Sequence, residues 1–511
     1  MFSRPLARAG WPVTFLLLCF SFPLQAQFEI RPYVQNTSTS KAVVIWYTSE
    51  SQPGFLRYGR EMGQWLNTLR TPAGTLHRVE LTNLNSNTKY FYEVGSDNTV
   101  FAGGEAYFFR THPKPGARVP FRFFAFGDFG DGSDTQQATA AQLLKQDPRH
   151  QFALLLGDII YSSGARDKYL VNYFPVYQDI IRHSAWWPTL GNHDIKSNNG
   201  AAYFEFFETP ANNPRKVENY YSFDYANAHM VSLDDELHFS GNNLQQQLDW
   251  VRRDLADAQS RGQQWLIVMW HKPPYSAGTH GDDQDIQKYF VPIMDEYGVD
   301  LVLCGHSHVA ERSFLLSNHR IVNRDLNRYP KDGFKPGTIY VVSGAGGKTG
   351  GVDPHPLMGF QLGNVTGFES IYINGDTLIG EWLNDKGERK DRFVMLKSGS
   401  GRPTLVAVDD EAITPGRFAI HYPNPFHASA PGAGLHIRFS ITSPAPVHAA
   451  VYDMLGRELA RLSNGEIRAA GEHELRWDGR DANGRVAARG VYFYRVQAGN
   501  RAHSAKVLVL P

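Results

Sequence analysis

Five apolar segments in the middle of the chain each end directly before a residue that can bind a metal ion. The segments are short and bounded by turn residues, which is typical of buried strands. Residues 123–127, 152–157, 187–191, 266–270 and 301–305 are followed by Asp128, Asp158, Asn192-His193, His271 and His306-Ser307-His308. In an α/β sheet the carboxyl ends of the strands form the edge where ligands bind. The five strand ends are therefore expected to meet at one site.

Each of these patterns is weak evidence alone, because a Gly-Asp pair is usually a turn and a single histidine is usually an ordinary core or surface residue. A donor nevertheless follows the segment in all five cases, and glycine, which permits a tight backbone, ends it in four. Carboxylate oxygens with imidazole nitrogens favour iron, manganese or zinc, and a carboxylate can bridge two ions. Two such ions form the usual clamp for displacement at phosphorus.

The 511 residues are enough for two to four domains, and their patterns indicate a multidomain chain with three folded regions. Residues 27–111 carry short aromatic and β-branched runs, which predict an N-terminal β-sandwich. After a short linker at 112–116, residues 118–397 alternate strands with helices expected at 135–146, 244–258 and 285–297, which predicts an α/β domain. A linker at 398–415 leads to residues 416–511, a second expected β-sandwich.

The N-terminus is typical of a secretory signal peptide covering residues 1–26. Arg4 and Arg8 precede an apolar run at 12–22, and cleavage is expected near Ala26. A membrane anchor is the alternative, but the apolar run is short for a span. Lipidation at Cys19 is disfavoured because Leu18 precedes it. We expect a secreted or cell-surface protein without a transmembrane segment in the mature chain.

Composition narrows the classes of partner and the sources of stability. The formal net charge is zero, which argues against a general attraction to nucleic acid. Cys304 would be the single cysteine of the mature chain, so no intramolecular disulfide is expected and stability must come from packing.

The five strand ends resemble the five motif blocks of calcineurin-like metallophosphoesterases, and they occur in the same order. In most of that superfamily the first block is Asp-x-His, whereas here Gly130 occupies the position of the histidine. Tyr161 instead stands three residues after the second aspartate, and this exchange is the mark of purple acid phosphatases. Residues 27–111 also resemble the fibronectin type III-like domain that precedes the catalytic region in large members of that family. The resemblance implies an αββα sandwich for the central domain.

The resemblance also implies a dinuclear metal site. A trivalent iron would be bound by Asp128, Tyr161 and His308. A divalent ion (iron, zinc or manganese) would be bound by Asn192, His271 and His306, with Asp158 bridging the two. An unperturbed phenol has a pKa of about 10, so only a strongly acidic cation keeps it ionised in neutral or acidic solution. Outside this context Tyr161 would be an ordinary aromatic residue beside a turn.

Two histidines are candidate catalytic residues. His193 is placed beside Asn192 to hydrogen-bond the phosphate or protonate the leaving oxygen. His280 lies nine residues after His271, where the family often has histidines for the same task, although a surface histidine is the alternative. Lys272 and Asp194 differ from the commonest residues of the family at those points, which bears on substrate preference and pH optimum. The glycine-rich residues 343–350 lack the spacing of a P-loop and are expected to be a strand-end turn near the site.

The last part of the chain resembles the type IX-like secretion-sorting domains that many Bacteroidetes-like bacteria attach to exported enzymes. Its characteristic blocks are at residues 422–426, 451–457, 489–494 and 506–510. This implies recognition by bacterial outer-membrane secretion machinery. A sandwich that binds carbohydrate or a protein partner is the alternative.

Together these features predict an exported acid phosphatase that hydrolyses small phosphate monoesters through a dinuclear metal-activated hydroxide. A phosphodiesterase or nucleotidase could use the same metal ligands, because pocket loops set that choice. A non-catalytic surface binding protein is the alternative from another class. An assay against monoesters and diesters separates these hypotheses.

Overall fold

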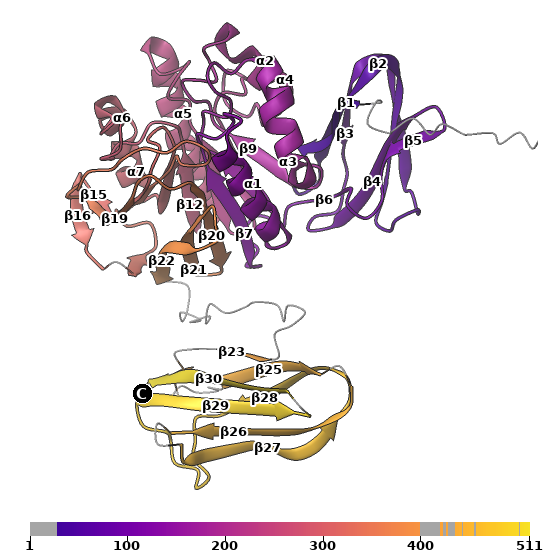
Figure 1. The fold of residues 1–511 in the computed structure, drawn as a ribbon. Helices are drawn as coiled ribbons and strands as arrows, with labels where there is room; N and C mark the ends of the chain where they lie inside the picture. The colour runs from indigo at the N-terminus through magenta and orange to yellow at the C-terminus, as the bar shows by residue number, and fades with distance from the viewer. Residues whose placement is uncertain are drawn as a thin grey trace, which may run out of the picture.

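The computed structural model describes residues 28–325, 327–398, 419–422, 426–427, 435–441, 443–453, 456–499 and 501–510. The predicted signal peptide, and the predicted linker apart from Ser398, lie outside the described residues. The three predicted regions are present as separate sets of sheets (Figure 1). Within the described ranges, no helix combines the length and apolarity needed to cross a membrane.

The N-terminal region is built around the long strand β2, which pairs with β1, β3 and β4 in a six-stranded antiparallel sheet. Trp46 and Tyr92 are completely buried in its core. The hydroxyl of Tyr90 accepts a hydrogen bond from the backbone N of Asn85 (2.9 Å), which closes the turn before β4. The strands are β1 (Phe28–Gln35), β2 (Ala42–Gly59), β3 (Asn67–Leu81), β4 (Lys89–Ser96), β5 (Thr99–Ala102) and β6 (Phe108–Arg110).

The central region contains two seven-stranded sheets. The first has the order β17 (Arg328–Asp332), β22 (Arg389–Ser398), β21 (Thr377–Asn384), β20 (Gly367–Asn374), β7 (Phe121–Phe126), β8 (Phe152–Leu155) and β9 (Ala185–Pro188). The second has the order β10 (Tyr221–Tyr225), β11 (Ala228–Ser232), β12 (Trp265–Met269), β13 (Leu301–Cys304), β18 (Ile339–Ser343), β14 (Ala310–Ser313) and β19 (Met358–Leu362). A separate hairpin joins β15 (Leu315–Ser317) and β16 (Arg320–Asn323).

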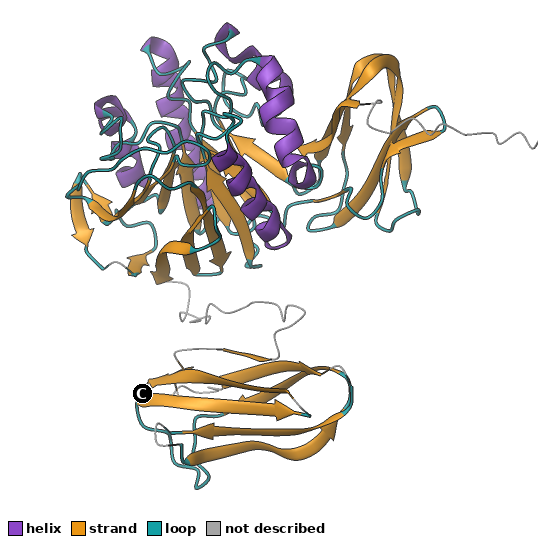
Figure 2. Ribbon diagram, in the orientation of Figure 1, coloured by secondary structure: helices purple, strands orange, loops and turns teal. Residues whose placement is uncertain are grey.

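The two sheets pack against each other, and helices cover their outer faces (Figure 2). Phe123 and Leu154 of the first sheet share a buried cluster with Ile267 and Leu303 of the second. The first sheet is covered by α1 (Asp134–Gln146), α3 (Phe174–Ile181) and α4 (Ala201–Phe206). The second is covered by α5 (Gly241–Ser260), α6 (Gln284–Tyr289) and α7 (Val291–Tyr297). Short turns complete the helical segments: η2 (Asp147–Arg149), α2 (Arg166–Lys168), η3 (Tyr169–Tyr173) and η4 (Asn198–Gly200).

The helices agree with the sequence prediction except in one place. The helix expected at 285–297 is divided into α6 and α7 at Phe290. Pro292 explains the division, because proline has no N–H to donate and is tolerated only in the first turn of a helix. It lies in the first turn of α7.

The expected linker at 112–116 is part of a fixed domain junction. The His112 ring is buried and lies 2.9 Å from Thr37 Oγ1 and 3.0 Å from the carbonyl oxygen of Asp224. The hydroxyl of Tyr33 donates to the carbonyl of Phe206 (3.0 Å). Polar contacts therefore attach the N-terminal region both to α4, beside the first central sheet, and to β10 of the second.

The C-terminal region is a sandwich of two sheets in which most strand pairs are antiparallel. Inward side chains of both sheets, including Trp477 and Tyr494, form one buried cluster. In β29 buried and exposed residues alternate, as expected for a strand with one face on a core. One sheet contains β23 (Ala419–Tyr422), β25 (Leu435–Ile441) and β28 (Gly471–Trp477). The other contains β24 (Phe426–His427), β30 (Arg501–Leu510), β29 (Gly490–Ala498), β26 (Ala445–Tyr452) and β27 (Glu458–Arg468). Parts of the predicted sorting blocks, residues 423–425 and 454–455, lie outside the described residues.

Candidate metal centre

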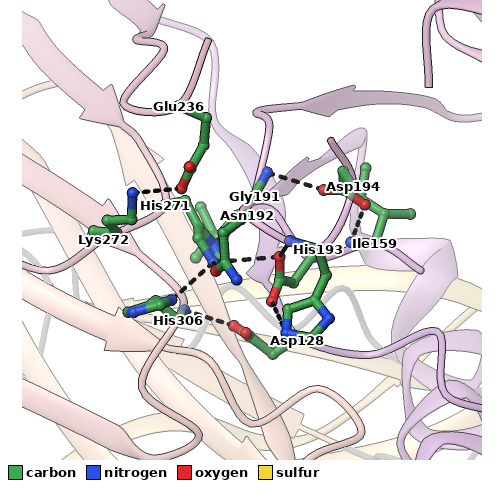
Figure 3. Close-up of polar contacts among 12 residues, drawn as sticks. Asp128, Ile159, Gly191, Asn192, His193, Asp194, Glu236, His271, Lys272 and His306 are labelled. Carbon is green, nitrogen blue, oxygen red and sulfur yellow. Dashed lines mark hydrogen bonds and ion pairs between the residues drawn. The ribbon is translucent and has the colours of Figure 1, made fainter. Parts of the chain in front are cut away.

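The five predicted strand ends belong to two different sheets. β7, β8 and β9 are parallel neighbours in the first sheet, and β12 and β13 are parallel neighbours in the second. Residues that follow these strands, among them Asp128, His193, His271 and His306, lie close together (Figure 3). The structure brings together all seven residues predicted as metal ligands, at the end of the sheets where ligands bind in α/β folds.

The backbone bends sharply where the ligand residues begin. Asp128, Asp158 and His306 have positive φ angles of 59°, 49° and 66°. Non-glycine residues adopt this region at a cost of about 1–2 kcal/mol, and such strain concentrates at functional sites. The bends turn these side chains away from the strand direction and toward one another.

Glycines next to or near the ligand residues allow the loops to pack closely. A Cβ on Gly157 would lie 2.4 Å from His271 Nδ1, and one on Gly305 would lie 2.5 Å from the carbonyl oxygen of Leu156. A Cβ on Gly130 would lie 2.0 Å from the carbonyl oxygen of Ile159, so no side chain fits at that position without a backbone shift. Position 130 therefore offers no donor side chain, and the Tyr161 hydroxyl lies beside Asp128 instead.

The first group of donors surrounds the Tyr161 hydroxyl. Its oxygen lies 2.8 Å from Asp128 Oδ1, 2.9 Å from Asp158 Oδ2 and 3.1 Å from His308 Nε2. One hydroxyl proton cannot serve both carboxylates. Burial, and then the charges of Asp128 and Asp158, raise the pKa of Tyr161 far above its ordinary value. Without a cation the phenol therefore stays protonated, and a strongly acidic metal ion is what would ionise it.

The second group surrounds Nε2 of His271. This atom lies 3.3 Å from Asn192 Oδ1, 3.2 Å from His306 Nδ1 and 3.5 Å from Asp158 Oδ1. Nδ1 of His271 donates to the carbonyl of Leu156 (2.7 Å), which fixes the ring and directs Nε2 toward the other donors. Burial lowers the pKa of His271, but the Asp158 carboxylate raises it further, so the net pKa is well above its ordinary value. The surroundings of Nε2 therefore favour a positive charge at this point.

Asp158 lies between the two groups and contacts both. Its Oδ2 faces Tyr161, and its Oδ1 faces His271 and accepts a hydrogen bond from the backbone N of His193 (2.7 Å). Burial alone would raise the pKa of Asp158, yet the adjacent His271 lowers it well below its ordinary range. A carboxylate in this position has one oxygen available for each group.

The donor set fits a pair of metal ions. One carboxylate oxygen each from Asp128 and Asp158 and one ring nitrogen of His271 all lie within 4.8 Å of one another. All three residues are buried. Burial, and then the neighbouring His271, lower the pKa of His306 to about 2, so its ring is neutral and offers a lone pair. Carboxylate, phenol, amide and imidazole donors suit iron, zinc or manganese better than calcium or copper(I).

The two predicted catalytic histidines border the centre. The His193 ring lies 4.5 Å from the Tyr161 ring between centroids, and its Nε2 lies 3.9 Å from Asp158 Oδ2. Its Nδ1 donates to the carbonyl of Ser162 (2.6 Å), which orients the ring. The His280 ring is exposed and lies 4.1 Å from the His306 ring. Both histidines are thus at the centre, on its solvent side.

Two buried aspartates have supporting positions that the sequence analysis did not identify. Asp194 accepts hydrogen bonds from the backbone N of Gly191 (2.9 Å), Ile159 (2.9 Å) and Ile160 (3.2 Å), which joins the loops after β8 and β9 (Figure 3). Asp235 accepts from the backbone N of His271 (3.2 Å) and Lys272 (2.6 Å). Asp234-Asp235 follow the apolar strand β11, so the strand-end signal used for the ligands was present for Asp235 as well.

The glycine-rich segment 343–350 is a turn at the end of β18, as predicted. Backbone N–H groups of Gly347 and Lys348 donate to the carbonyl of Asp128 at 3.0 and 3.1 Å. A Cβ on Gly344 would lie 2.2 Å from the carbonyl of Ser307. The segment therefore packs against the ligand loops and supports Asp128.

Family models match all three regions of the chain. Residues 121–310 match the calcineurin-like phosphoesterase model, and residues 28–111 match the purple acid phosphatase N-terminal domain. Residues 427–502 match a FlgD Ig-like domain.

Individual proteins show the same likeness. An uncharacterized protein of Mycobacterium tuberculosis is 28% identical over 312 residues, which cover 53% of this chain and 58% of that protein. The Fe(3+)-Zn(2+) purple acid phosphatase 12 of Arabidopsis thaliana is 27% identical over 335 residues, which cover 61% of this chain and 67% of that protein. A purple acid phosphatase structure from yellow lupin seeds superposes with a TM-score of 0.60 at 21% identity, covering 72% of this chain and 74% of that one. The lupin structure shows the shared fold. The chain spans little more than half the length of the mycobacterial protein.

Proposed function

We propose that this chain, which carries a purple acid phosphatase N-terminal domain and a calcineurin-like metallophosphoesterase domain, is an acid phosphatase that hydrolyses phosphate monoesters. The observation that supports this most strongly is the convergence of seven donor side chains in two groups that share Asp158. Two adjacent ions are the usual arrangement for in-line displacement at phosphorus.

The metal assignment of the proposal follows the two groups. Asp128, Tyr161 and His308 would hold a trivalent iron, and Asn192, His271 and His306 would hold a divalent iron, zinc or manganese ion, with Asp158 as the bridge. The phenol of Tyr161 favours the trivalent ion, because an anionic oxygen donor stabilises a high charge. When bound, the ion pair supplies Lewis acidity that neutralises the phosphate and activates water.

The residues of the chain have separate tasks in this scheme. The carbonyl of Ser162 holds the His193 ring so that Nε2 faces the space beside Asp158, where it can hydrogen-bond the phosphate or assist the leaving oxygen. His280 would contact the same substrate from the opposite loop. Asp194 and Asp235 fix the loops and so hold the donors in place before substrate binds.

The substrate panel that tests the proposal contains a monoester and a diester with the same leaving group. We expect purified protein to hydrolyse p-nitrophenyl phosphate with a kcat/KM at least about tenfold above that for bis-p-nitrophenyl phosphate, a difference of about 1.4 kcal/mol. A reversed ranking would identify a diesterase. No hydrolysis of either by protein with both metals bound would support a non-catalytic binding protein.

Replacing His193 with alanine should lower kcat by about 10²–10³-fold while metal content stays at the wild-type value. The reason is that the His193 ring is not one of the proposed ligands. Its nearest approach to a ligand oxygen through a ring nitrogen is 3.9 Å, from Nε2 to Asp158 Oδ2. Elemental analysis and steady-state kinetics check this, with the exposed His319→Ala as a matched control that should change neither. Loss of metal in the His193 variant would show that His193 is itself a ligand.

The C-terminal region is proposed to serve export and not catalysis. Every predicted ligand lies before Val309, and the C-terminal sandwich has its own core. A variant lacking residues 422–511 should therefore keep wild-type kcat but fail to reach the cell surface or the medium. Activity in cell fractions and on the purified truncation checks both parts. A folded truncation with little activity would show that this region contributes to the site.

A further inference from the structure

Lys196 places a positive charge beside the proposed catalytic centre. Its Nζ lies 2.9 Å from Nε2 and 3.0 Å from Nδ1 of His193. Nε2 of His193 is in turn 3.9 Å from Oδ2 of Asp158, the carboxylate between the two donor groups. The ammonium is therefore one hydrogen-bonded contact away from the space where the substrate phosphate would bind.

The backbone that carries Lys196 is anchored on both sides. Asp194 is completely buried and its carboxylate accepts three backbone hydrogen bonds from the loops after β8 and β9. The backbone N of Ser197 donates to the carbonyl of Ser163 (3.0 Å). The Lys196 side chain is exposed, but its Cα is thus held near His193, within reach of the centre.

Lys196 differs in its pairing from the two other lysines of this neighbourhood. Lys272 forms an ion pair with Glu236 (2.8 Å), and Lys348 forms one with Asp131 (3.3 Å). No carboxylate within the described ranges lies at ion-pair distance from the Lys196 ammonium. An ammonium without a counter-ion attracts an anion more strongly than one that is already paired.

We propose that Lys196 forms an anion subsite that favours substrates with a second phosphoryl group next to the one that is cleaved, such as diphosphates. This inference rests on the proposed phosphatase function and specifies its substrate class. For pyrophosphate, the oxygen of one water bonds to the phosphorus at the centre and the bridging P–O bond breaks. The bridging oxygen leaves with the second phosphoryl group, and the proton from water passes to this phosphate or to solvent. Lys196 contacts the second phosphoryl group throughout.

The test compares two substrates in three variants of the full-length, metal-loaded protein. Lys196→Ala should lower kcat/KM for pyrophosphate about tenfold more than kcat/KM for p-nitrophenyl phosphate, mainly through KM. Lys196→Arg keeps the charge and should retain most of the preference. Lys145→Ala removes an exposed lysine of α1 away from the centre and should change neither substrate. Equal losses on both substrates, or no loss on either, would overturn the subsite.

A binding experiment separates the subsite from the catalytic proposal. Isothermal titration should show that metal-loaded wild-type protein binds pyrophosphate more tightly than inorganic phosphate. In Lys196→Ala the ratio of the two dissociation constants should be about tenfold smaller. This result supports the subsite even if the wild type hydrolyses no ester. A preference for pyrophosphate that survives in Lys196→Ala would contradict it.

Discussion

Replacing Asp158 with alanine is expected to remove both metal ions and nearly all hydrolytic activity. Asp158 directs one carboxylate oxygen at each donor group, with Oδ2 2.9 Å from the Tyr161 oxygen and Oδ1 3.5 Å from His271 Nε2. Its loss also leaves the partly buried backbone N of His193 without its acceptor. Mutating a residue that only hydrogen-bonds to a metal ligand lowers metal affinity about 10–100-fold. Losing a ligand that is shared by both ions should lower the affinity of each ion by more than that.

Elemental analysis and kinetics measure both effects of this change. Asp158→Asn is the matched variant, because the amide oxygen can still accept from His193 while the negative charge is gone. We expect it to retain at most one ion. Circular dichroism confirms that both variants are folded. Near-normal content of both metals in Asp158→Ala would contradict the bridging role.

Replacing Tyr161 with phenylalanine is expected to abolish a violet colour of the oxidised protein. If Tyr161 binds trivalent iron as a phenolate, visible light moves electron density from the ring oxygen to the metal, which produces the colour. Phenylalanine keeps the ring but removes that oxygen. The iron should then bind less tightly or become easier to reduce, because an anionic oxygen donor stabilises the higher oxidation state. Part of the activity should survive, since the second donor group does not include Tyr161.

A neighbouring tyrosine provides the control for this experiment. Tyr169 is completely buried, and its hydroxyl makes no hydrogen bond within the described part of the chain, so Tyr169→Phe should leave the visible spectrum unchanged. Visible absorption and iron content are measured together. An oxidised wild-type protein that contains iron and is colourless would refute the Tyr161 assignment, whereas a protein with only zinc or manganese would leave the reaction standing.

The sequence pattern pointed to the donor residues other than Tyr161 because they follow short apolar strands, whereas Tyr161 was assigned from the family resemblance alone. In that setting a polar residue marks the strand's carboxyl end, and the structure brings those ends together. The pattern could not show that β7 and β12 belong to different sheets. Both strands are buried on both faces and read as apolar runs, so nothing local to either one specifies its neighbours.

The features that the sequence analysis missed depend on contacts between distant residues. His112 reads as part of a linker, but it is buried between Thr37 and the backbone of Asp224. Asp194 was noted only as a departure from the family pattern, and its three backbone hydrogen bonds come from loops up to 35 residues away. The proposed role of Lys196 as an anion subsite likewise depends on its distance from His193, and no periodicity or spacing rule predicts that distance.

Metal titration of the purified, metal-free protein is the most direct test of a phosphoesterase that works through two ions. Iron and then zinc or manganese are added in measured equivalents while hydrolysis of p-nitrophenyl phosphate is followed. We expect little activity at one equivalent per chain, a steep rise as the second site fills, and a plateau at two. Full activity at one equivalent, or in the metal-free protein, would contradict the two-metal centre.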